Sequence, residues 1–266
     1  MADARLLSEV IELAWQAGQQ ILTVYGRNHF EVTAKADDSP LTAADLASQA
    51  VIVAGLGRLT PDIPVLAEES ADQVTDAQRR GWNLFWLVDP LDGTKEFVNR
   101  NGEFTVNIAL VEGHYPVLGV VHVPARGICY HAATGHGAFR QRTGEPAEPL
   151  QPTRPAAAPV RVVGSRSHPG PDLAGFVERL GPHRFVPVGS ALKFCLVAEG
   201  SADVYPRLGP TWWWDTAAAQ CVAECAGARV VQTDGRRLGY NRGDDLRNPH
   251  FLVYADDGRD WLNCLP

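Results

Sequence analysis

The sequence feature that most constrains this chain is the stretch at positions 86–97, which reads WLVDPLDGTKEF. Residues 85–88 are apolar or aromatic, a pattern that predicts a short buried strand. We expect the strand to deliver Asp89 and to end at Pro90, because proline has no N–H to donate to a sheet ladder. Asp92 follows closely, so two carboxylates lie on one short turn at the end of a buried strand.

Two carboxylates on one tight turn repel each other unless a cation lies between them. Gly93 permits the sharp turn that brings Asp89 and Asp92 together. Divalent cations such as Mg²⁺ bind oxygen ligands of this kind, and the backbone carbonyl of Leu91 offers one more. The alternative is an ordinary surface turn, because Asp, Pro and Gly are all frequent turn residues. The D-x-x-D-G spacing alone does not decide between the two.

Two further acidic positions favour the metal site. Glu68 and Glu69 end the apolar run at positions 63–66. Asp215 closes the aromatic run at positions 212–214 and opens an Ala-rich helical segment. We therefore expect three ends of strands or helices, each carrying a carboxylate, to converge on one site.

These motifs resemble those of a known superfamily. In the same order, E-E at 68–69, D-P-L-D-G-T at 89–94 and W-D-T-A-A at 214–218 are typical of the lithium-sensitive, Mg²⁺-dependent phosphomonoesterases. That superfamily includes inositol monophosphatases, fructose-1,6-bisphosphatases and 3′(2′),5′-bisphosphate nucleotidases. The longer wording DPLDGTKEFVNRNGEFTVNIAL, at 89–110, is more similar to the CysQ-type bisphosphate nucleotidases than to the inositol enzymes. The resemblance extends over nearly the whole chain.

The resemblance implies both a fold and an activity. The fold is α/β (α+β), a layered αβαβα sandwich of the inositol monophosphatase and sugar phosphatase type, with the site between its two halves. The activity is that of a Mg²⁺-dependent phosphatase that converts adenosine 3′,5′-bisphosphate (PAP) to AMP and phosphate in sulfate assimilation. A second expected substrate is 3′-phosphoadenylyl sulfate. Li⁺ is expected to inhibit by taking one of the weaker metal positions.

By the same resemblance, two Mg²⁺ ions bind in the site, and the occupancy of a third position stays open. Glu68, Asp89 and the Leu91 carbonyl would hold the first ion, which activates the attacking water. Asp89, Asp92 and Asp215 would hold the second, which stabilises the leaving oxygen. Asp89 is thus expected to bridge the two ions.

Three residues are expected to act beside these ligands. By the resemblance, Asp45 and Thr94 orient and deprotonate the water, and Glu69 stands behind the metal ligands as a further acidic group. Thr42 is expected to cap a helix in which Asp45 occupies the third position, so the alternative role of Asp45 is to complement the helix dipole. The backbone N–H groups of Gly93 and Thr94 begin a short helical turn and are suited to bind the phosphate.

Four more residues are expected to contact the adenosine and its second phosphate. The segments S-R-S-H, G-S-x-L-K and Y-P-R resemble nucleotide-binding positions of the bisphosphate nucleotidases and implicate His168, Ser190, Lys193 and Arg207. Arg and Lys suit a phosphate that is bound but not cleaved. Each has a structural alternative: a helix cap for Ser190 and surface charge for the others. The predicted substrate-binding set is completed by Glu68, Leu91, Asp92, Gly93, Thr94 and Asp215.

Trp212 and Trp213 depart from the typical family wording before W-D. We expect them either to shape the base pocket or to pack in the interior.

Composition limits the partners of the chain. Of the 266 residues, 45% are hydrophobic and 21% are charged, as in ordinary globular proteins, and the formal net charge is −7. No basic block is present, which argues against a nucleic-acid polymer as partner. The partner that the resemblance implies is a small-molecule nucleotide bisphosphate. The chain is expected to be a monomer or a homodimer.

The sequence also bears on location. The N-terminus has no basic-then-apolar signal pattern, and no apolar run approaches the length of a transmembrane span. The five cysteines form no C-x-x-C pair, which predicts reduced, buried thiols. These features predict a cytoplasmic protein, with peripheral association at the inner face of the cell membrane left open.

Periodicity and turn residues predict the elements of the fold. Helices are expected over 3–25, 44–59, 171–180, 190–198 and 216–226, and a polar surface loop over 70–81. Strands are expected over 63–67, 85–88, 104–111, 116–123, 128–132, 137–140, 161–164, 183–188, 202–205, 229–231 and 251–254. The Pro-rich stretch 146–159 predicts a loop that connects two domains. The first, 1–145, is α+β and carries most metal ligands; the second, 160–266, is α/β and carries Asp215 and the nucleotide pocket.

Two other functions stay open at this point. One is an inositol monophosphatase or another sugar phosphatase, which would share the metal site but would not need a second cationic pocket. The other is a non-catalytic module that senses the nucleotide or the metal. A sensor has no need for a water-activating pair such as Asp45 and Thr94, so the intact motif set argues against it.

Overall fold

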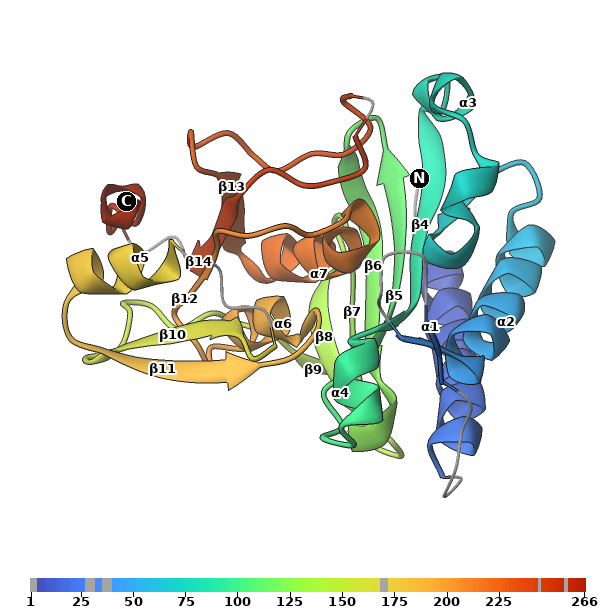
Figure 1. The fold of residues 1–266 in the computed structure, drawn as a ribbon, viewed down its shortest axis with the longest axis horizontal. Helices are drawn as coiled ribbons and strands as arrows, with labels where there is room; N and C mark the ends of the chain where they lie inside the picture. The colour runs from blue at the N-terminus through green and yellow to red at the C-terminus, as the bar shows by residue number, and fades with distance from the viewer. Residues whose placement is uncertain (1–3, 27–31, 35–39, 168–171, 244, 256–257) are drawn as a thin grey trace.

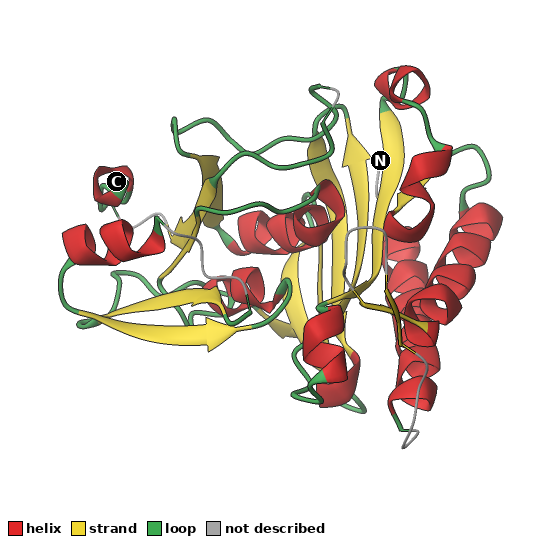
Figure 2. Ribbon diagram, in the orientation of Figure 1, coloured by secondary structure: helices red, strands yellow, loops and turns green. Residues whose placement is uncertain are grey.

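The computed structural model describes residues 4–26, 32–34, 40–167, 172–243, 245–255 and 258–266, arranged as alternating layers of helices and sheets (Figure 1). Helices α1 (Ala4–Tyr25) and α2 (Ala43–Leu59) cover one face of a seven-stranded sheet. Helices α6 (Leu192–Ala198) and α7 (Trp213–Ala226) lie between this sheet and a five-stranded one. Helix α5 (Leu173–Leu180) covers the outer side of the second sheet, so the predicted αβαβα sandwich is confirmed (Figure 2).

The first sheet is antiparallel except at one edge. Its strand order is β3-β4-β5-β6-β7-β8-β9, and only the pair β3 and β4 is parallel among the described strands of this sheet. Its members are β3 (Val65–Ala67), β4 (Leu84–Asp92), β5 (Thr105–Glu112), β6 (Tyr115–Val123), β7 (Ile128–Ala133), β8 (Gly137–Arg142) and β9 (Glu148–Pro149). Because Ala67 pairs with Val88 in the parallel register, the acidic residues that follow the two strands emerge at the same end of the sheet.

The second sheet is mixed, with strand order β11-β10-β12-β14-β13. Its members are β10 (Val160–Ser165), β11 (His183–Val188), β12 (Val204–Arg207), β13 (Ala228–Gln232) and β14 (Phe251–Ala255). Strands β1 (Val32–Ala34) and β2 (Pro40–Thr42) form a separate antiparallel pair. The remaining short elements are η1 (Glu68–Gln73), α3 (Asp76–Arg80), α4 (Thr94–Val98), η2 (Pro124–Arg126) and η3 (Leu262–Cys264).

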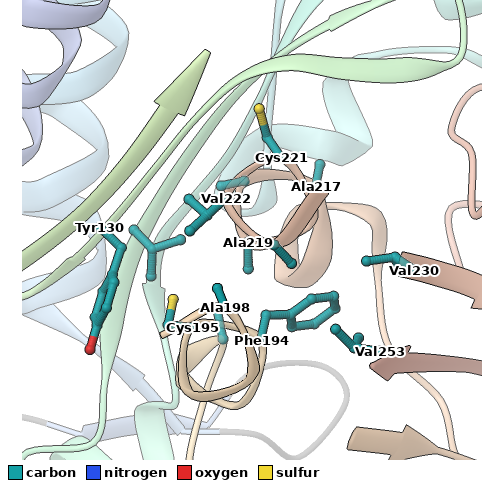
Figure 3. Close-up of a cluster of buried hydrophobic side chains, with 14 of the residues drawn as sticks. Tyr130, Phe194, Cys195, Ala198, Ala217, Ala219, Cys221, Val222, Val230 and Val253 are labelled. Atoms are coloured by element: carbon teal, nitrogen blue, oxygen red, sulfur yellow. The ribbon is translucent and has the colours of Figure 1, made fainter. Parts of the chain in front are cut away.

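The core between the two sheets is built around α7. This helix is buried on nearly all sides, as expected for a helix that packs between two sheets. Figure 3 shows side chains from both sheets and both inner helices meeting there: Tyr130, Phe194, Cys195, Ala198, Ala217, Ala219, Cys221, Val222, Val230 and Val253. The contact with the first sheet is close at Gly119 of β6, where a Cβ would lie 2.3 Å from the carbonyl oxygen of Ala218. The position of α7 therefore depends on a residue without a side chain.

Two predictions about local structure were wrong. The strand does not end at Pro90: β4 continues to Asp92, with a register shift against β5 between Asp89 and Asp92. A bulge tolerates proline because the ladder is interrupted there. Residues 70–81 are not simply a loop, since Thr75 and Gln78 form a capping box that starts α3.

The proposed division into two domains stays a prediction. The first sheet contains residues up to Pro149 and the second begins at Val160, and part of the predicted linker pairs as β9 with β8. Among the described residues, none of the helices combines the length and the apolar character that crossing a bilayer requires.

Replacing Gly119 by Ala should destabilise the protein by about 1–3 kcal/mol, because the new methyl group would meet the backbone of α7, which cannot move cheaply. Urea unfolding monitored by circular dichroism measures this. Gly57→Ala is the matched control: Gly57 is an exposed residue of α2, and a Cβ added there would have nothing within 4 Å. Alanine there should stabilise by up to about 1 kcal/mol through helix propensity. Equal stability of both variants would contradict this packing.

Candidate active site

One cavity of about 530 Å³ contains most of the residues singled out from the sequence. Its volume lies in the range of about 300–1,000 Å³ that is usual for small-molecule sites. It is lined by residues from the end of β3, the turn after β4, α6, β12 and the start of α7. The predicted site residues among them are Glu68, Asp89, Leu91, Asp92, Gly93, Thr94, Ser190, Lys193, Arg207 and Asp215.

Several carboxylates line this cavity close to one another. One oxygen atom from each of Asp89, Asp92 and Asp215 lies within 4.8 Å of the other two. Burial raises the pKa of Asp89 well above its ordinary value, and the charges of Glu68, Asp92 and Asp215 raise it further. A buried cluster of this kind is unfavourable without a positive charge, and its donors are the oxygen ligands that Mg²⁺ prefers. The residues present therefore fit the predicted metal.

The bulge in β4 shapes the turn that carries two of these carboxylates. Within it, the Leu91 N–H donates to Oδ1 of Asp89 at 3.0 Å, which fixes the Asp89 side chain against its own backbone. Asn107 of β5 donates from Nδ2 to Oδ2 of Asp92 at 3.4 Å. Gly93 follows with φ 91°, a left-handed conformation that favours glycine, and α4 begins at the next residue.

Helix α2 supports the acidic segments from behind. The Ser48 hydroxyl donates to the Pro90 carbonyl oxygen at 2.7 Å. The Glu69 N–H donates to Oε1 of Gln49 at 3.2 Å. Asp45 occupies the third position of α2, as predicted, and is fully buried, and its charge contributes to the raised pKa of Asp89. Neither Asp45 nor Glu69 lines the cavity, so their catalytic roles stay predictions.

Asp215 joins the cluster from the first turn of α7. The helix expected over 216–226 begins earlier than predicted: α7 starts at Trp213, and Asp215 is its third residue. Its Oδ2 accepts a hydrogen bond from the Trp212 N–H at 2.8 Å, which holds the side chain at the helix start. Burial and the charges of Asp92 and Glu68 raise its pKa well above the ordinary value.

Lys193 and Arg207 bring positive charge into the same cavity. Lys193 is only 6% exposed, so the surface-charge alternative was wrong for this residue. Its ammonium group donates to the Ser190 carbonyl oxygen and lies 5.5 Å from the centre of the Tyr205 ring. Burial lowers the pKa of Lys193 to about 8, opposed by the nearby Asp92 carboxylate. Arg207 is half-buried and donates to the Pro210 carbonyl oxygen at 2.6 Å.

Ser190 does not cap α6, contrary to the alternative considered from the sequence. The cap position is Ala191, and Ser190 adopts the left-handed conformation with φ 49°, which prevents it from starting the helix. Its hydroxyl is buried and finds no hydrogen-bond partner among the described residues. Ser190 also lines the cavity. His168 lies outside the described residues.

A buried carboxylate network beside the cavity was not predicted. Glu103 accepts hydrogen bonds from Nε of Arg166 at 3.0 Å, from Arg126 at 3.1 Å and from the Gly189 N–H at 2.9 Å. The Glu103 carbonyl oxygen also lies 3.3 Å from where a Gly93 Cβ would stand. Glu103 therefore joins the turn after β4 to the segment before α6. Its partners are distant in sequence, and no local pattern marks them.

Asp89→Asn should remove metal binding without harming the metal-free fold, because it takes one charge out of a repulsive cluster. Mg²⁺ at a hundredfold excess over its Kd should raise the Tm of the wild type by roughly 5–10 °C. Thermal melts with Mg²⁺ or with a chelator measure this gain, which the variant should largely lose. Asp62→Asn, at an exposed position, is the control and should keep the gain. An unchanged Mg²⁺ response in Asp89→Asn would contradict the metal site.

Glu103→Gln should destabilise the protein in a pH-dependent way. Burial alone would raise the pKa of Glu103, but hydrogen bonds from Arg166 and the Gly189 N–H and the charges of Arg166 and Arg126 lower it. A lowered folded-state pKa contributes stability above the unfolded value of about 4.3 and loses it as the pH falls through the folded value. Unfolding in urea should show a cost of about 1–2 kcal/mol at pH 7.

In the same urea titrations that cost should shrink below about pH 4. Glu148→Gln is the matched control, since Glu148 pairs with Arg140 at an exposed position and contributes little. A difference between wild type and Glu103→Gln that stays constant with pH would rule out the ionic contribution.

Comparison with known proteins places the fold and the site in a family. A sequence model of the Inositol monophosphatase family matches residues 3–260. The 3′(2′),5′-bisphosphate nucleotidase CysQ of Salmonella typhimurium is 49% identical over 249 residues, which covers 93% of this chain and 99% of the relative. CysQ of Haemophilus influenzae is 35% identical over 264 residues, covering 99% of this chain and 97% of the relative.

Solved structures agree with the sequence comparison. The crystal structure of CysQ from Bacteroides thetaiotaomicron superposes with a TM-score of 0.81 and 41% identity, covering 94% of this chain and 96% of that one. An IMPase from Thermotoga maritima gives a TM-score of 0.75 at 26% identity, with 97% and 95% covered. These matches over nearly the full length show that the chain belongs to the inositol monophosphatase family.

Proposed function

We propose that this chain is a Mg²⁺-dependent 3′(2′),5′-bisphosphate nucleotidase that hydrolyses adenosine 3′,5′-bisphosphate to AMP and phosphate. The observation that carries the proposal is the presence of both a carboxylate cluster and two cationic side chains in one cavity. The carboxylates of Asp89, Asp92 and Asp215 line it, and so do Lys193 and Arg207. The high identity to CysQ nucleotidases supports the same substrate. That reaction would serve sulfate assimilation, and 3′-phosphoadenylyl sulfate is a further candidate substrate.

Mg²⁺ is the typical metal of this family, and the three clustered carboxylates fit it. We assign the donor set to two positions. Glu68, Asp89 and the Leu91 carbonyl would hold one ion, and Asp89, Asp92 and Asp215 the other. Bound there, two ions supply a water of lowered pKa and offset the charge on the attacking and leaving oxygens. This assignment would account for the carboxylates that the cluster contains in addition to the two of the β4 turn.

The remaining chemistry falls to groups of the chain itself. Asp45 and Thr94 would orient the attacking water, with Thr94 lining the cavity and Asp45 buried behind Asp89. The backbone N–H groups of Gly93 and Thr94 would bind the oxygens of the phosphate that is cleaved. The left-handed conformation of Gly93 would leave these N–H groups accessible. Glu69, fixed by Gln49, would keep the Glu68 segment in place.

The second phosphate would bind at Lys193 and Arg207. Lys193 is buried, so its charge acts through a low dielectric and attracts an anion strongly. Arg207 is fixed by its bond to the Pro210 carbonyl oxygen, and the unpartnered Ser190 hydroxyl can donate to the same phosphate. A substrate with two phosphates would therefore span the cavity, whereas a monophosphate would fill one end only.

The competing functions differ in whether the substrate uses Lys193 and Arg207. An inositol monophosphatase would use the carboxylates but leave Lys193 and Arg207 without a substrate partner. A non-catalytic sensor would bind the nucleotide and the metal without releasing phosphate. The buried ammonium of Lys193 in the cavity favours the bisphosphate substrate over the first, and the fully buried Asp45 beside the cluster favours turnover over the second.

Phosphate release with Mg²⁺ tests the proposal directly. Adenosine 3′,5′-bisphosphate should be hydrolysed far faster than inositol 1-phosphate, and Li⁺ should inhibit both reactions. Lys193→Met keeps the buried volume and removes the charge, so it should raise KM for the bisphosphate by at least roughly tenfold. For a nucleoside monophosphate that carries only the phosphate to be cleaved, the same substitution should change KM much less.

The outcomes separate the alternatives. A preference for inositol 1-phosphate would keep the metal site and reject the nucleotide pocket. Binding of the nucleotide without any phosphate release would indicate a sensor. An equal effect of Lys193→Met on bisphosphates and monophosphates would place Lys193 outside the second-phosphate site.

A further inference from the structure

We propose that Trp212 is the platform on which the nucleobase of the substrate stacks. The inference rests on the proposed nucleotidase function and adds the element that selects for a base, which neither the carboxylates nor the cations can recognise. It assigns a role to an aromatic residue whose place the sequence left open between the base pocket and the interior.

Exposure distinguishes Trp212 from the other aromatic residues of the cavity. Phe194, Tyr205 and Trp212 line it. Phe194 and Tyr205 are each only 2% exposed and pack edge-to-face with one another at 5.4 Å. Trp212 is 42% exposed, the largest exposed aromatic surface among the described residues of the chain. A base that enters the cavity therefore meets an open ring face at Trp212.

The ring of Trp212 is held in one orientation from behind. Trp214 stacks against it with ring centres 5.6 Å apart and planes only 9° from parallel, and Trp214 itself is 6% exposed. The Trp212 backbone is fixed on both sides: its N–H donates to Asp215 at 2.8 Å and its carbonyl oxygen accepts from Asn248 at 2.6 Å. A ring fixed before binding loses little conformational freedom when a ligand stacks on it.

The neighbouring Trp213 shows what a packing tryptophan looks like at this place. It is 3% exposed, lies under the guanidinium of Arg79 at 4.9 Å and contacts Tyr240 edge-to-face. Trp213 is thus part of the interior. Trp212 has one ring face covered by Trp214, and its exposed area has no packing role that the described residues account for.

The platform lies where the chemistry of the substrate requires it. Trp212 is bonded through its N–H to Asp215, a member of the carboxylate cluster, and it lines the same cavity as Arg207. In a nucleoside 3′,5′-bisphosphate one ribose joins both phosphates to the base. With one phosphate at the carboxylates and the other at Lys193 and Arg207, the base would extend from the ribose that joins them, and stacking on an indole suits any purine because every base has a π-face.

The test compares substrates with and without a base. Trp212→Ala should raise KM for adenosine 3′,5′-bisphosphate on the order of tenfold, with a much smaller change in kcat. For the abasic analogue, 1-deoxyribose 3,5-bisphosphate, KM should stay within about twofold of the wild type. Trp212→Leu keeps an apolar side chain without a π-face and should behave like Trp212→Ala, whereas Trp212→Phe should retain most of the affinity.

Phe185→Ala is the matched control, because Phe185 is an aromatic residue of β11 that is 38% exposed and does not line the cavity. It should leave both KM values unchanged. An equal rise of KM for the nucleotide and the abasic analogue, or no rise for either, in Trp212→Ala and Trp212→Leu would overturn the platform.

A binding measurement separates this inference from the proposed function. AMP should quench the tryptophan fluorescence of the wild type, and Trp212→Phe should lose that quenching. If the chain releases no phosphate from the nucleotide but AMP still quenches only the wild type, the nucleotidase fails and the platform stands. If phosphate is released but quenching is the same in both proteins, the platform fails and the nucleotidase stands.

Discussion

Repulsion among closely spaced carboxylates is the constraint on which the rest of this structure depends. Asp89 and Asp92 of β4 and Asp215 of α7 are brought within 4.8 Å, where each raises the cost of ionising the others. The fold holds them there with neutral donors: the Leu91 N–H for Asp89 and the Trp212 N–H for Asp215. Such a cluster is maintained at a cost to stability, and a divalent cation offsets that cost while it supplies the chemistry.

The same cavity combines opposite charges. Lys193 is close enough to Asp92 for that carboxylate to oppose the effect of burial on the pKa of Lys193, and both residues line the cavity. Glu103 keeps the two halves in register, since it binds Gly189 from the second half and packs behind Gly93 in the first. Binding, metal chemistry and the contact between the sheets are therefore parts of one network.

The motifs predicted the layered fold and most of the candidate residues that line one cavity, because carboxylates at strand ends and the D-G-T turn are local signals. Long-range packing was not predictable. Pro90 was expected to end a strand that continues through a bulge, since the register of β5 decides where the ladder is interrupted. Ser190 resembled a helix cap but adopts a left-handed conformation. The role of Glu103 was not predictable from the sequence, because it depends on hydrogen bonds with Arg166 and Gly189, which only the fold brings near.

The most direct test of the central claim is a crystal structure of the protein with Mn²⁺ in place of Mg²⁺, with anomalous scattering used to locate the metal. The account predicts two anomalous peaks, both bridged by the Asp89 carboxylate, one toward Glu68 and the other toward Asp92 and Asp215. A single peak away from Asp89, or no peak in this cluster at a Mn²⁺ concentration that supports phosphate release, would contradict it.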